Sequence, residues 1–102
     1  MVNQDWSYGM QLPVQTLTRT LADPWEDDAT VEDLVTIAQK AEATGHDFVG
    51  VCDHIAIPDN DYAANMRTTW YDTVATLSFL AAHTKTVNLL SVVWIAAYRH
   101  PL

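Results

Sequence analysis

The sequence predicts an α/β fold of the order βαβαβ, in which three parallel strands are linked by two helices. Residues 48–52 and 87–94 form nearly continuous apolar runs, which are typical of parallel strands covered on both faces. The segment before each run carries apolar residues at helical spacing. Crossovers between parallel strands are nearly always right-handed, so we expect two right-handed crossovers.

The first strand is expected at residues 6–12, where Tyr8, Met10 and Leu12 alternate with polar or small residues. Pro13 ends this strand, because proline has no N–H group to donate to a neighbouring strand. A polar connection over residues 14–29 follows and contains a cluster of acidic residues. Connections of this length in compact domains are often functional.

The first helix begins after Thr30, which we expect to cap it together with Asp33 in a capping box. Gly45 is expected just past the end of the helix, where glycine takes up a left-handed conformation without steric penalty. One apolar stripe recurs at helical spacing and should face the sheet: Val31, Leu34, Val35, Ala38 and Ala41.

The second helix follows a loop over residues 55–69, with either Thr69 or Asp72 as its N-cap. It is expected to end near residues 83–84. Four of its side chains should point inward: Val74, Leu77, Leu80 and Ala81. The third strand is then expected at residues 87–94, with a further loop over residues 95–102.

The charge balance is strongly acidic, with 13 acidic residues against five basic ones and a net charge of −8. Such a chain lacks the basic patch that binding to nucleic acid or to an anionic membrane requires. The N-terminus does not have the pattern of a secretory signal, and no apolar run approaches the roughly 20 residues of a membrane span. We therefore expect a soluble, cytoplasmic protein with no nucleic-acid partner and no membrane partner.

Several common sites are absent from the sequence. The single cysteine, Cys52, excludes an internal disulfide and is expected to be a small buried apolar residue. No two of the four histidines have ligand spacing on one element, so no metal site is predicted. Gly9, Gly45 and Gly50 are wrongly spaced for a phosphate-binding loop, which argues against a Rossmann or NTPase fold.

Asp53 and His54 follow the central strand directly, at the end where α/β folds place their chemistry. In an extended segment their side chains point to opposite faces, so we do not expect them to bond to each other. The histidine could exchange a proton near neutral pH, and the aspartate could accept from a ring N–H or a hydroxyl. Alternatively, Asp53 begins a turn and His54 is a satisfied structural histidine. Both interpretations stay open.

Four segments, in this order and spacing, support a family resemblance: residues 9–13 (GMQLP), 48–54 (FVGVCDH), 70–82 and 87–101 (VNLLSVVWIAAYRHP). With them the chain resembles the amino-terminal part of the bacterial-luciferase-like monooxygenase family, particularly its deazaflavin (coenzyme F420)-dependent branch. The resemblance covers nearly the whole chain. It implies a TIM barrel that binds a flavin or deazaflavin at the carboxyl face of its strands.

The resemblance also implies site residues and a reaction. His54 would be the catalytic acid/base or substrate-orienting residue, and Asp53 would lie against the cofactor, which would be F420 or alternatively FMN. Ser91 and Val92 would match the site of a non-prolyl cis peptide behind the cofactor ring. Gln11 would line the mouth, together with Gly9 and Trp94. The implied reaction is hydride transfer between a small organic substrate and the cofactor.

The length departs from the family's fold, because a (β/α)₈ barrel takes about 250 residues. We expect residues 1–102 to form a single domain that corresponds to the first three strands of such a barrel. Whether this chain alone is an active enzyme stays open. An alternative function is a non-catalytic truncated barrel module that self-assembles through its exposed sheet, and we expect a homo-oligomer. A flavodoxin-like binding domain is a third, weaker interpretation, since it would need further strands.

Overall fold

A computed structural model describes residues 6–16 and 18–100. Three parallel strands, β1 (Gly9–Gln11), β2 (Phe48–Val51) and β3 (Asn88–Ser91), form one sheet in the order β1-β2-β3. Helix α1 (Val31–Ala43) connects the first two strands, and α2 (Thr73–Ala81) connects the second and third. The predicted βαβαβ fold is confirmed.

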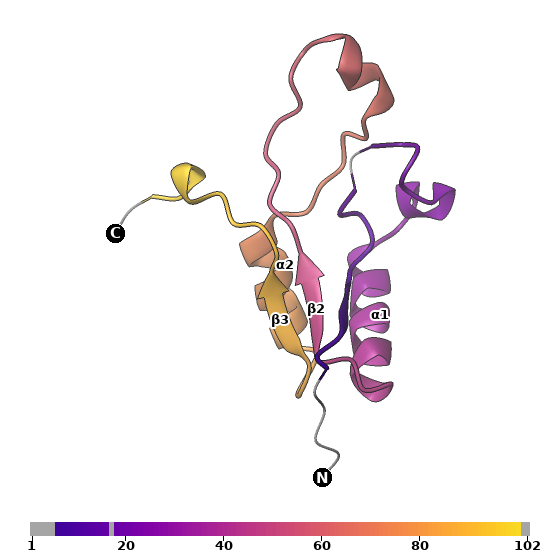
Figure 1. Ribbon diagram of the computed structural model, residues 1–102, viewed down its shortest axis with the longest axis vertical. Coiled ribbons are helices and arrows are strands. Elements are labelled where there is room, and N and C mark those ends of the chain that lie inside the picture. The colour runs from indigo at the N-terminus through magenta and orange to yellow at the C-terminus, as the bar shows by residue number, and fades with distance from the viewer. Residues whose placement is uncertain (1–5, 17, 101–102) are drawn as a thin grey trace.

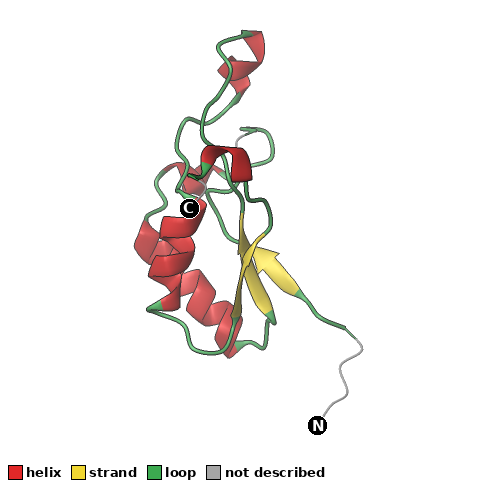
Figure 2. Ribbon diagram, turned by 90° about the vertical axis from the view of Figure 1, so that its left-hand side faces the viewer, coloured by secondary structure: helices red, strands yellow, loops and turns green. Residues whose placement is uncertain are grey.

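Both helices pack on the same face of the sheet (Figures 1 and 2). The connections and the segment after β3 also contain three short 3₁₀ helices: η1 (Pro24–Asp27), η2 (Asp61–Asn65) and η3 (Ala96–Tyr98). Among the residues that the structure describes, no helix combines the length and the apolar character needed to cross a membrane.

Helix α1 begins and ends as the sequence predicts. The Thr30 hydroxyl accepts a hydrogen bond from the Asp33 N–H, and the Asp33 carboxylate accepts from the Thr30 N–H at 2.8 Å. This capping box satisfies N–H groups that the first turn of a helix leaves without intrahelical partners. At the other end, Gly45 has a φ of +85°, a conformation in which side-chain-bearing residues are strained.

The core lies between the helices and the helix-facing side of the sheet. Leu34, Ala38 and Ala41 of α1 are buried, as their helical spacing predicts. The other buried apolar residues of this core come from β2, α2 and the segments beside β1 and β3: Leu12, Val49, Val51, Leu80 and Val87. Burying side chains of this size stabilises the fold by about 1.5–3 kcal/mol each.

The inward face of α2 was only partly predicted. Leu80 is buried and Leu77 is half-buried, but Val74 and Ala81 are exposed. Besides Leu80, the buried positions of α2 are Thr73 and Thr76, and the three recur at helical spacing. Apolar residues occur on nearly all sides of this helix, so their spacing does not identify the face that packs on the sheet.

Asp72 is the N-cap of α2, and its carboxylate accepts from the Ala75 N–H at 2.8 Å. The alternative cap, Thr69, lies in the preceding loop. The strands are shorter than predicted, because residues 6–12 contribute only Gly9–Gln11 and residues 87–94 only Asn88–Ser91. The apolar residues beyond β3 continue into a loop, where backbone pairing with β2 soon ends.

The two long connections, residues 14–29 and 55–69, are joined to each other by backbone hydrogen bonds and ion pairs. An isolated antiparallel bridge pairs Thr18 with Met66, and the Arg19 N–H donates to the Asn65 carbonyl at 3.0 Å. The buried guanidinium of Arg67 forms ion pairs with Glu26 at 3.3 Å and with Asp27 at 3.0 Å. These contacts hold the 14–29 and 55–69 connections together beyond the carboxyl ends of β1 and β2 (Figure 1).

The face of the sheet away from the helices has no covering layer among the described residues (Figure 2). Leu90 and Val92 are 41% and 50% exposed, and residues of this face alternate with the core residues of each strand. Val92 lies across Gly50, where an added Cβ would approach its Cγ2 atom to 2.7 Å. The sheet therefore presents an apolar surface opposite the helices.

Candidate functional site

The predicted site residues lie at one edge of the sheet, where the three parallel strands end. Gln11 is the last residue of β1, Ser91 is the last residue of β3, and Val92 follows it. Asp53 and His54 follow β2 after one intervening residue, Cys52. Parallel strands bring their carboxyl ends to the same edge, which is why residues distant in sequence meet there.

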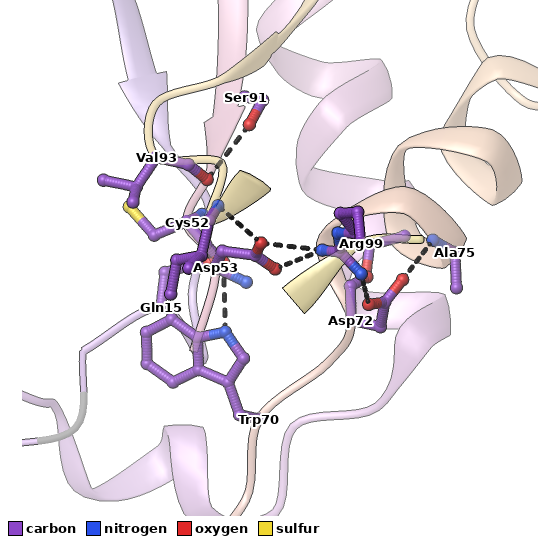
Figure 3. Close-up of polar contacts among 11 residues, drawn as sticks. Gln15, Cys52, Asp53, Trp70, Asp72, Ala75, Ser91, Val93 and Arg99 are labelled. Carbon is purple, nitrogen blue, oxygen red and sulfur yellow. Dashed lines mark hydrogen bonds and ion pairs between the residues drawn. The ribbon is translucent and has the colours of Figure 1, made fainter. Parts of the chain in front are cut away.

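Two side chains hold the backbone N–H and C=O groups of Cys52, the residue before Asp53 (Figure 3). The Cys52 N–H donates to the Oε1 atom of Gln15 at 2.6 Å, and the Cys52 carbonyl accepts from the Nε1–H of Trp70 at 3.0 Å. Gln15 is buried, with 4% of its surface exposed. The backbone that carries Asp53 and His54 is thus held by one side chain from the 14–29 connection and one from the segment just before α2.

Asp53 forms an ion pair that was not predicted. Arg99 Nη2 lies 2.6 Å from its Oδ1 atom and 2.7 Å from its Oδ2 atom, and the Ile95 N–H donates to Oδ2 at 2.9 Å (Figure 3). Burial of the carboxylate acts to raise the pKa of Asp53. The hydrogen bonds from Ile95 and Arg99 outweigh that effect and lower the pKa from its ordinary value of 3.8. Asp53 is therefore a charged, satisfied acceptor.

Arg99 connects three parts of the site. Its Nη1 atom donates to Asp72, the N-cap of α2, at 2.9 Å, and its guanidinium carbon lies 5.4 Å from the centre of the Trp94 ring. The bond from the Ala75 N–H, followed by the bond from Arg99, lowers the pKa of Asp72. One arginine thus ties the end of β2, the start of α2 and the segment after β3 together.

His54 lies beside Trp70, whereas Asp53 bonds to Arg99 and Ile95. The His54 ring lies 5.4 Å from the Trp70 ring, at an interplanar angle of 55°. The Nε2 atom is buried and has no hydrogen-bond partner among the described residues. The two rings line a hollow of about 210 Å³ together with four other residues: Ile55, Ala56, Ile57 and Thr68.

The other predicted residues make local contacts. The Ser91 hydroxyl donates to the Val93 carbonyl at 3.0 Å, and the Gln11 side chain donates to the Gln15 carbonyl at 2.9 Å. No peptide bond in the described part of the chain is cis, so the bond between Ser91 and Val92 is trans and the expected cis peptide is not found. The β3 end nevertheless keeps its predicted place beside the end of β2, since Val92 N–H donates to the Val51 carbonyl.

Sequence reasoning missed Gln15 and Arg99. A signal for Arg99 exists, because the chain has five basic residues and a buried aspartate needs a cationic partner. Nothing in the sequence identifies Gln15, which lies in a connection without regular spacing. Trp70 is half-buried at the site, and its ring N–H donates to the Cys52 carbonyl.

The residues present suit a flat organic ring. The hollow has aromatic and aliphatic walls, and one of its lining residues, His54, has a buried ring nitrogen without a partner among the described residues. An apolar lining with one or a few polar atoms is typical of sites for organic ligands and cofactors. In the described residues, no three histidine, cysteine, aspartate or glutamate side chains come together as potential metal ligands.

Comparison with known proteins gives one match. The family model described as luciferase-like monooxygenase matches residues 10–102. No curated protein and no solved structure matches the chain. The matched range includes β2, β3 and both helices, and with them every strand-end residue described above.

Proposed function

Because the chain belongs to the luciferase-like monooxygenase family, we propose that it is the amino-terminal part of a flavin- or F420-dependent oxidoreductase. The proposed substrate is a small organic molecule, and the proposed cofactor is F420, with FMN as the alternative. Two observations support this proposal: the family match and the strand-end hollow beside His54. The family's fold is a TIM barrel, in which such strand ends form the active site.

Particular residues would hold the cofactor at this edge of the sheet. His54 and Trp70 would contact its ring from the hollow, and Gln11, Ser91 and Val92 would lie near its edge. The cofactor would supply hydride transfer, which amino-acid side chains do not perform themselves. Asp53 would help to shape the cofactor site indirectly, by holding Arg99 and the Ile95 backbone, since both of its oxygens already accept hydrogen bonds from them.

His54 would hold or move a proton during the reaction. The observation that carries this role for His54 is its buried Nε2 atom, which has no hydrogen-bond partner among the described residues. A buried polar atom without a partner costs about 1–3 kcal/mol, and a substrate or cofactor group could satisfy it. A neutral imidazole has one N–H nitrogen and one bare nitrogen, so this atom could act as donor or acceptor at the site.

Native mass spectrometry of the 102-residue chain with FMN and F420 supplied together tests the proposal. We expect the protein to retain F420 at one cofactor per chain. Retention of FMN instead would identify the alternative cofactor. If neither cofactor is retained by the folded chain, the proposed pocket is wrong for this chain.

A second candidate function is a non-catalytic module that self-assembles through its sheet. The uncovered face, with Leu90 and Val92 about half exposed, favours it because large apolar surfaces are usually covered by partners. A homo-oligomer would cover this face, and the net charge of −8 would keep the chain in solution. The same spectra report the mass of the assembly, and a monodisperse, cooperatively folded monomer would contradict this function.

A further inference from the structure

Backbone pairing between β1 and β2 stops just before the proposed site. Just past β1, the Leu12 N–H donates to the Gly50 carbonyl at 3.0 Å, and Pro13 has no N–H group to continue this pairing. In a strand, alternate residues direct their N–H and C=O groups to opposite neighbours. Gly50 faces β1, so Cys52 also faces β1, at a level where no backbone of β1 remains.

Two side chains bond to Cys52 where the backbone of β1 no longer does. Gln15 accepts from the Cys52 N–H at 2.6 Å, and Trp70 donates to the Cys52 carbonyl at 3.0 Å. On the other side, the Asp53 N–H still donates to the Val93 carbonyl at 3.1 Å. The amide orientation of Gln15 follows from its partner, because an N–H group requires an oxygen opposite it.

A strained residue brings Gln15 to this place. Val14 has a φ of 61°, which is an outlier for a β-branched residue, and only 1% of its surface is exposed. Its N–H donates to the Glu26 carboxylate at 2.6 Å, and Glu26 is paired with the buried Arg67. Strain of this kind persists where the surroundings hold it, and it often marks a functional site.

We propose that Gln15 is a positioning residue that holds the Cys52 peptide and, through it, the placement of Asp53 and His54. This role rests on the proposed function, because it matters to activity only if those residues serve a cofactor pocket. Gln15 acts through the backbone of β2. Its contribution is to extend the sheet by one hydrogen bond at the position from which the two site residues diverge.

The hydrogen bond itself can be tested in the unmodified protein. A long-range HNCO experiment should detect a coupling between the Cys52 amide nitrogen and the Gln15 side-chain carbonyl carbon. A Gln15→Met variant should then speed hydrogen exchange at the Cys52 amide at least tenfold, with little change at the amides of Val49 and Val51. A Gln15→Glu variant retains an oxygen acceptor and should restore protection. Absence of the coupling, or equal exchange in wild type and Gln15→Met, overturns the proposal.

Cofactor affinity separates positioning from general stability. Gln15→Met should weaken binding of FMN or F420, whichever the wild type retains, about tenfold. The matched control is Gln39→Met, which removes one side-chain bond, to the His83 carbonyl, on the exposed side of α1. It should leave that affinity unchanged, and an equal loss in both variants overturns the positioning role. If the wild type binds neither cofactor, the proposed function fails, while the coupling and exchange results still decide whether Gln15 holds Cys52.

Discussion

Asp53 and Arg99, which are 46 residues apart in the sequence, form an ion pair with nitrogen–oxygen distances of 2.6 and 2.7 Å. The aspartate side chain is 1% exposed and the arginine side chain 25% exposed. Removing one partner of such a pair leaves a buried charge without compensation. The segment after β3 is therefore attached to the end of β2 by electrostatics as well as by backbone bonds.

Replacing Arg99 should destabilise the protein in a pH-dependent way. In Arg99→Met the Asp53 carboxylate loses its cation, so the urea midpoint at pH 7 should fall. Because the pKa of Asp53 is lowered in the folded state, its stabilising effect is present above the ordinary value of 3.8 and is lost as the pH falls through the lower folded-state pKa. The difference between wild type and variant should shrink over that range. Arg19→Met, at an exposed position, is the control and should change the midpoint little.

Glu42 should confer acid resistance on the opposite end of the sheet. Its Oε1 atom accepts from the N–H groups of Lys85 at 2.8 Å and Val87 at 3.0 Å, and also from that of Thr86. The bonds from Thr86, Val87 and Lys85 lower its pKa from 4.5 to about 2. Its stabilising effect is thus complete above about pH 4.5 and lost as the pH falls through about 2.

Thermal melts of wild type and Glu42→Gln between pH 2 and 7 test this stabilising effect of the Glu42 carboxylate. The variant should melt at a lower temperature at pH 7, and the two curves should converge toward pH 2. A constant difference across the range would show that the carboxylate's charge is not what stabilises the loop before β3.

Replacing His54 should affect chemistry more than folding. In His54→Gln the group that we propose to transfer a proton is removed, so turnover of a substrate that reduces or oxidises the bound cofactor should fall about 10²-fold or more. The urea midpoint should stay close to that of wild type, because the His54 Nε2 atom makes no hydrogen bond within the described residues. Parallel losses of turnover and stability would make His54 a structural residue.

Adding a methyl group at Gly50 should overpack the uncovered face of the sheet. The new Cβ would lie 2.7 Å from Val92 Cγ2, and overpacking of this kind costs about 1–3 kcal/mol. We expect the destabilisation by Gly50→Ala to lie near the lower limit of this range, because Val92 is half exposed and its side chain can rotate away. Urea unfolding of Gly50→Ala and of the double variant Gly50→Ala/Val92→Ala measures the effect. The second change should recover most of the loss, and no recovery would place the strain elsewhere.

Local sequence signals predicted the parts of the fold that local chemistry controls. The capping box at Thr30, the left-handed Gly45 and the buried stripe of α1 follow from side chains within one or two helical turns. The parallel arrangement of the strands was also predictable, because strands connected by single helices can form a sheet in only a few topologies. The inward face of α2 did not follow, since its apolar residues mark no single stripe.

In the site too, only the features that depend on neighbouring residues in the sequence were predictable. The sequence by itself placed Asp53 and His54 at the end of a buried strand, because a parallel strand and its carboxyl end can be recognised from a short run of residues. The groups that contact these two residues and Cys52 are known only from the three-dimensional fold. Arg99 reaches Asp53, and Gln15 and Trp70 reach Cys52, across 18 to 46 residues of chain. Such contacts depend on how loops fold back over the sheet, and no spacing in the sequence encodes that path.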